Sequence, residues 1–132
     1  MIEISMKDAL ELYTVLTRQF DTYNKDGKDI PFTLGAVRFD IARNANVLKP
    51  SIEAYEKARN DLITQLSNGT GKLDNETNPA VLMEFGTEVE KILGQRLGFD
   101  VTRIEKEDLK LDVNPIAITA LMVLHSTGVL RG

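Results

Sequence analysis

The sequence predicts a small, mainly helical domain. Its 132 residues are close to the commonest domain length, and a hydrophobic content of 42% is enough for one core. Apolar residues recur at spacings of three and four over most of the chain, which is the period of a helix with one buried face. One such stripe crosses Pro50 without changing phase. We therefore expect an antiparallel helical bundle or hairpin built on one long, Pro-kinked helix, with a small β-hairpin near residues 99–113, in a single domain covering residues 1–132.

The first helix is expected at residues 6–23. Ser5 to Asp8 resembles a capping box, and the apolar residues that follow have helical spacing. Ile2 and Ile4 alternate with polar residues, which permits a short strand ahead of this helix. The segment 24–29 then has the composition of a turn. It lacks the aspartate and glutamate that begin and close an EF-hand loop, so we interpret it as a plain turn.

The longest helix is expected from Leu34 to Leu66. Its apolar positions alternate in steps of three and four, as in a heptad seam, with the same phase before and after Pro50. We expect the proline to kink one continuous helix, because it removes the hydrogen bond to the Asn46 carbonyl; a break into two helices near Lys49 is the alternative. The seam is the candidate interface, and its residues are Leu34, Val37, Ile41, Leu48, Ile52, Tyr55, Arg59, Leu62 and Leu66.

Arg59 interrupts this seam. An inward-facing arginine usually has a carboxylate partner, so we expect a salt bridge at a helix contact.

The rest of the chain contains two more expected helices. Residues 67–79 are rich in Gly, Asn, Asp and Thr and predict a mobile polar loop. Asn78-Pro79 starts a helix that we expect to stop at Gly98. Residues 99–105 and 109–113 are the strand candidates for the small hairpin, and Asn114-Pro115 starts a last, strongly apolar helix ending near Gly128.

Charge and composition argue against several classes of protein. The net charge of −4 arises from 16 basic and 20 acidic residues without long blocks of one sign, so we expect no nucleic-acid and no membrane partner. The chain has no cysteine, which excludes disulfides, thiolate zinc sites and cysteine nucleophiles. No apolar run approaches the roughly 18 residues that span a bilayer, and the first residues do not resemble a signal peptide. We expect a soluble protein.

No catalytic, cofactor-binding or metal-ligating set is predicted. His125 is the single histidine, and we interpret it as a surface or helix-end residue. The glutamates of the predicted helices alternate with lysine and arginine, as on a solvated face. Gly69 to Lys72 resembles part of a phosphate loop, but Leu73 stands where that motif needs serine or threonine. We therefore expect no enzyme activity and no cofactor.

Residues 32–63, "FTLGAVRFDIARNANVLKPSIEAYEKARNDLI", resemble a family of small proteins of unknown function encoded by tailed bacteriophages and prophages. The motif centres on Leu48, Pro50, Tyr55, Glu56, Ala58, Arg59 and Leu62, and "VTRIEKEDLKLDVNPIAITALMVL" resembles the tail of that family, so the similarity covers residues 32–124. It transfers no catalytic residues.

This resemblance implies a bacteriophage protein without enzyme activity. The expected function is that of a virion component or virion-assembly factor, which contacts copies of itself or another phage structural protein through its helices. The expected location is the host cytoplasm during assembly, or the virion. The alternative is a small phage-encoded inhibitor of a host enzyme or defence protein.

Overall fold

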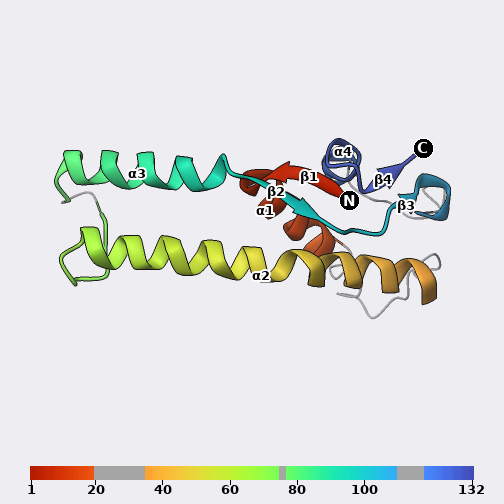
Figure 1. Ribbon diagram of the computed structural model, residues 1–132, viewed down its shortest axis with the longest axis horizontal. Coiled ribbons are helices and arrows are strands. Elements are labelled where there is room, and N and C mark those ends of the chain that lie inside the picture. Colours follow the sequence, from red (N-terminus) through yellow and green to blue (C-terminus); the bar gives the residue numbers. More distant parts are fainter. Residues whose placement is uncertain (20–34, 75–76, 110–117) are drawn as a thin grey trace.

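The molecule is elongated along one long helix (Figure 1). The computed structural model describes residues 1–19, 35–74, 77–109 and 118–132. Helix α2, Gly35–Leu66, has 32 residues, which corresponds to roughly 48 Å at 1.5 Å per residue. It runs beneath all the other elements that Figure 1 labels.

Helix α2 continues through Pro50, as the unbroken phase of its apolar stripe predicts. Pro50 is exposed, and so is Asn46, whose carbonyl loses its helical hydrogen-bond donor to the proline, so that this part of the helix is open to water. The alternative of two helices separated near Lys49 is therefore wrong. The predicted bend at Pro50 remains a prediction.

The N-terminus forms a strand and a helix, as expected. Strand β1, Ile2–Ser5, pairs antiparallel with strand β2, Arg96–Phe99, so that Ile2 lies opposite Phe99. Helix α1, Met6–Thr14, starts at Ser5, whose Oγ accepts a hydrogen bond of 3.1 Å from the Asp8 amide. A π-helix, η1, Val15–Gln19, continues it. Residues 20–34, which include the end of the expected helix and the expected turn, lie outside the described residues.

Helix α3, Pro79–Leu93, lies antiparallel beside the second half of α2 (Figure 1). The Asn78 side chain accepts a hydrogen bond from the Ala80 amide at its start, as the cap-and-proline signature predicts. The helix ends at Gly94, and the prediction of Gly98 is wrong, because Leu97 and Gly98 belong to β2 and pair with β1. Pairing with a distant strand therefore outweighs the helical spacing of Leu97.

The C-terminal elements complete the fold. Strand β3, Ile104–Glu105, pairs in parallel with strand β4, Leu130–Arg131. Between them are the 3-10 helix η3, Lys106–Leu109, and helix α4, Ile118–Ser126. The small antiparallel element is present and is formed by β1 and β2. The described part of the expected hairpin behaves differently, because Ile104 and Glu105 pair with β4 and Leu109 belongs to η3. Residues 110–117, including the expected cap at Asn114-Pro115, lie outside the described residues.

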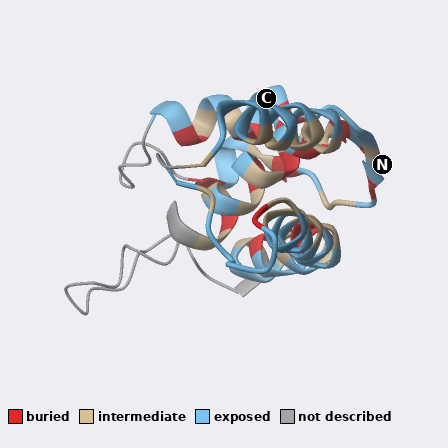
Figure 2. Cartoon of the chain, turned by 90° about the vertical axis from the view of Figure 1, so that its left-hand side faces the viewer, coloured by how far each residue is buried: buried red, intermediate tan, exposed pale blue. Residues whose placement is uncertain are grey.

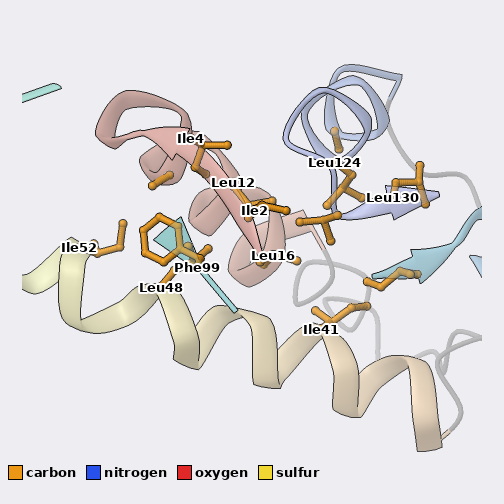
Figure 3. Packing of buried hydrophobic residues seen from close by; sticks show 14 of the residues in the cluster. Ile2, Ile4, Leu12, Leu16, Ile41, Leu48, Ile52, Phe99, Leu124 and Leu130 are labelled. Carbon is orange, nitrogen blue, oxygen red and sulfur yellow. The ribbon is translucent and has the colours of Figure 1, made fainter. Parts of the chain in front are cut away.

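One hydrophobic core joins β1, α1, the middle of α2 and the C-terminal elements (Figure 3). Each of its members has less than a tenth of its surface exposed to solvent, and they are Ile2, Ile4, Met6, Ala9, Leu12, Leu16, Ile41, Leu48, Ile52, Phe99, Ile104, Leu109, Ala120, Leu124, Val129 and Leu130. Ile52 is the last α2 residue in this set. Beyond it, α2 and α3 continue together away from the core.

Candidate functional site: a projecting helical arm

The feature that stands apart from the core is a two-helix arm. We define the arm as residues 53–93, which comprise the end of α2, the connecting segment and helix α3; the rest of the chain is the body (Figure 1). Figure 2 views the molecule from the arm end, where the nearer helices are mostly exposed or half-buried. The arm is the part of the described structure that has the fewest buried side chains.

Helix α3 is rich in hydrophobic residues yet none of its described side chains is buried. Eight of its 15 residues are hydrophobic: Ala80, Val81, Leu82, Met83, Phe85, Val89, Ile92 and Leu93. Two helices lying side by side can cover only the facing side of each other. The remaining apolar surface of α3 therefore stays open to solvent.

The side of α3 that faces α2 is half-buried. The Arg59 guanidinium lies over the Phe85 ring, 5.7 Å from its centroid, and Ile92 packs against the core. Arg59 forms no ion pair within the described part of the chain, and its side chain is exposed, so the predicted salt bridge is corrected to a cation–π contact.

The outer side of α3 carries an exposed apolar ridge. Leu82 and Met83 are 37% and 75% exposed, and Gly86 and Glu90 are exposed beside them. Residues spaced by three, four, seven and eight along a helix share one face. We call Leu82, Met83, Gly86 and Glu90 the α3 ridge.

The structure places much of the predicted interface inside the protein. Ile41, Leu48 and Ile52 are buried in the core, and Val37 and Tyr55 are partly buried against it. This part of the seam is covered by the chain itself, so it is not available to a partner.

The outer members of the predicted interface lie elsewhere. Leu62 and Leu66 are half-buried in the arm. Leu34 lies outside the described residues. The seam therefore does not form one continuous exposed surface.

The start of the loop after α2 is folded back on the helix end. The buried Ser67 Oγ accepts a hydrogen bond of 3.0 Å from the Gly71 amide, and the Gly69 amide donates to the Thr64 carbonyl at 3.1 Å. Asn68 and Gly69 have φ values of 54° and 84°, a left-handed conformation that often ends helices. These amides are used within the chain, which fits a helix stop rather than a phosphate loop.

The arm is acidic and the first half of α2 is basic. Residues 53–93 contain eight carboxylates and four basic side chains, a net charge of −4. Residues 35–50 contain three basic side chains and one carboxylate, a net charge of +2. The overall charge of −4 does not show that the arm is acidic whereas the first half of α2 is basic.

Two exposed ion pairs lie on the arm. Lys57 and Asp61 are 2.8 Å apart, and Lys91 and Glu88 are 3.0 Å apart. The side-chain hydrogen bond from Lys57 to Asp61 raises the pKa of Lys57 above its ordinary value of 10.5. Because both pairs are exposed, solvent screens them and each contributes little to stability.

Among the described residues, the surface of the body is hollowed beside α4 at more than one place. One depression, of about 400 Å³, lies between α1 and α4 and is lined mainly by apolar side chains together with Glu11 and Thr119. A second, of about 370 Å³, lies beside α4 and has Lys106 and His125 at its edge. His125 and Ser126 both line the second depression, but the Ser126 hydroxyl donates its hydrogen bond to the Val123 carbonyl at 3.2 Å and not to His125.

Residues 1–19, 35–74, 77–109 and 118–132 contain neither a metal-binding cluster nor a helix that could span a membrane. No three His, Cys, Asp or Glu side chains there are grouped so that they could hold a metal ion. No helix in these ranges is both long and apolar enough to cross a membrane.

No protein-family model matches the sequence, and no curated protein or solved structure matches it. The resemblance to phage proteins therefore remains a prediction from the motif residues alone. The exposed residues Met83 and Phe39 were not predicted as site residues. For Met83, the sequence signal that could have revealed it was the hydrophobic content of residues 79–93, which exceeds what one buried helix face needs.

Proposed function

We propose that this chain is a non-enzymatic bacteriophage protein, a virion component or virion-assembly factor that acts through helix-mediated protein contacts. The single structural observation that supports contact with other proteins is helix α3, in which eight of 15 residues are hydrophobic and no described side chain is buried. The arm that carries α3 is the proposed contact element.

Exposed apolar side chains on a projecting element favour a protein partner. Such residues cost free energy in water, and burial regains about 25 cal/mol for each Å² of apolar surface removed from solvent. Contiguous apolar surface with a polar rim is typical of interaction sites. On α3, Met83 and Leu82 provide the apolar centre, and Glu84 and Glu90 provide charged neighbours.

The phage assignment is supported by the motif around Leu48, Pro50 and Tyr55. The structure gives these residues roles in folding: Leu48 is in the core, Tyr55 packs beside it, and Pro50 lies on the exposed side of α2. The motif thus describes a helix that crosses from body to arm. We propose the host cytoplasm during assembly, and the virion, as its locations.

The test is association of the protein with itself and with purified particles of a tailed phage that carries this sequence. Mass is measured by light scattering over a dilution series, and binding by co-sedimentation with intact and disrupted particles. The Met83→Glu variant puts a charge on the α3 ridge and is expected to lose association. Gln65→Glu adds the same charge at an exposed α2 position in the arm and is expected to behave like the parent protein.

A defined oligomer or co-sedimentation that Met83→Glu abolishes supports the proposal. If the protein stays monomeric at every concentration and does not co-sediment with phage particles, the proposal is overturned. That result would favour the host-directed inhibitor.

A further inference from the structure

We propose that the α3 ridge of one copy docks on the exposed side of the first half of α2 in a second copy, so that copies join head to tail. This inference rests on the proposed function, since it names the partner of the arm. The receiving surface consists of Phe39, Ala42, Arg43 and Asn46, which we call the α2 patch. All four are exposed, and their spacing of three, four and seven places them on one helix face.

Each surface has an exposed apolar anchor. Phe39 is 65% exposed on α2, and Met83 is 75% exposed on α3. A methionine sulfur packs favourably against an aromatic ring. Burying these two side chains against each other removes apolar surface that the chain itself leaves in water.

The charges of the two surfaces are complementary. The arm has a net charge of −4 and residues 35–50 of α2 have a net charge of +2. Glu90 on the ridge and Arg43 on the patch form no ion pair with other described residues. Opposite charges across an interface favour that pairing, and like charges oppose it.

This charge pattern selects the head-to-tail arrangement over symmetric ones. Contact between two ridges would bring two acidic arms together, and contact between two patches would bring two basic surfaces together. Contact between ridge and patch pairs opposite signs. The α2 patch of a second copy therefore supplies the basic surface that complements the acidic arm.

The spacing of the anchors and charges is compatible along both helices. Met83 and Glu90 are seven residues apart, about 10 Å along α3, and Phe39 and Arg43 are four residues apart, about 6 Å along α2. The long arginine side chain can span the difference. Met83 can thus lie on Phe39 of the next copy while Arg43 of that copy approaches Glu90.

The α3 ridge and the α2 patch of the same chain cannot contact each other. The arm and the first half of α2 lie at opposite ends of the molecule (Figure 1). A contact between two different surfaces leaves one of each unused in every dimer, so it generates a ring or an open chain of copies. Repetition of this kind suits a protein that forms part of a virion.

The first experiment mixes two variants that each lose one surface. Met83→Glu removes the ridge and Phe39→Glu removes the patch, and circular dichroism verifies that both variants remain folded. Each variant alone is expected to be monomeric by light scattering. An equimolar mixture is expected to form dimers that do not grow further, because the one intact ridge meets the one intact patch. Gln65→Glu is the control that assembles normally.

The second experiment exchanges the charged pair. Arg43→Glu and Glu90→Arg are each expected to weaken association at least about tenfold, and the double variant is expected to return to within about threefold of the parent. No restoration in the double variant, or a monomeric mixture of Met83→Glu with Phe39→Glu, would overturn the head-to-tail contact.

Failure of this inference can be distinguished from failure of the proposed function. A parent protein that stays monomeric but co-sediments with phage particles through Met83 would overturn the second copy as partner and leave the proposed function in place. A parent protein that neither self-associates nor binds particles would overturn both.

Discussion

Asn44 and Thr102 hold each other through two hydrogen bonds. Asn44 Nδ2 donates to the Thr102 carbonyl at 2.8 Å, and the Thr102 amide donates to Asn44 Oδ1 at 2.7 Å. Asn44 is fully buried in the middle of α2, whereas Thr102 lies between β2 and β3. One polar side chain thus fixes the long helix to a segment that is 58 residues away in the sequence.

Asn44→Ala is expected to destabilise the protein by about 2–4 kcal/mol, because it removes both partners of the Thr102 backbone groups and each buried group without a partner costs about 1–3 kcal/mol. Chemical denaturation measures this loss. Asn60→Ala, at an exposed position of the same helix, is the matched control and is expected to change stability by no more than about 0.5 kcal/mol. Equal stability of the two variants would contradict the role of this pair.

Local signals in the sequence predict the helices and their starts. Ser5 and Asn78 each have a side chain that accepts a hydrogen bond from a backbone amide in the first helical turn, as their positions predict. The unbroken phase of the apolar stripe across Pro50 predicts a continuous helix, and the alternation at Ile2 and Ile4 predicts β1. Each of these features depends on residues close together in the chain.

Features that depend on distant residues were not predictable in the same way. No local pattern indicates that residues 2–5 pair with residues 96–99, and this pairing ends α3 at Gly94 and not at Gly98. An apolar seam also has the same period whether its own chain or a second copy covers it. The sequence therefore predicted the face formed by Ile41, Leu48 and Ile52 but not what covers it.

Replacing Pro50 by alanine tests the continuity of α2. A proline inside a helix costs about 3 kcal/mol relative to alanine, and part of this cost is offset because proline restricts the unfolded chain by up to about 1 kcal/mol. Pro50→Ala is therefore expected to stabilise the protein by about 2–3 kcal/mol in chemical denaturation, with no loss of helix by circular dichroism. Lys49→Ala is the neighbouring exposed control, for which little change is expected. Loss of helix in Pro50→Ala would contradict a continuous α2.

The Arg59–Phe85 contact is expected to stabilise the arm. Arg59→Ala should cost about 0.5–1 kcal/mol, the usual strength of an exposed cation–π contact. A double-mutant cycle with Phe85→Leu should show coupling, because the guanidinium lies 5.7 Å from the ring centroid. Lys57→Ala is the control: it removes only an exposed ion pair with Asp61 and should show no coupling to Phe85→Leu. Additive effects of Arg59→Ala and Phe85→Leu would mean that the contact contributes nothing.

Two glycines are expected to respond to alanine in opposite directions. Gly86 lies inside α3 with no atom within 4 Å of an added Cβ, so Gly86→Ala should stabilise the protein by about 0.5–1 kcal/mol through helix propensity. Gly128 has φ +86°, and a Cβ there would lie 3.4 Å from Ile2 Cγ2, so Gly128→Ala should destabilise it by about 1–2 kcal/mol through backbone strain. Thermal and chemical denaturation of both variants measure the two signs. A stabilising Gly128→Ala would contradict the left-handed turn that leads from α4 into β4, and a destabilising Gly86→Ala would contradict the open surface beside the α3 ridge.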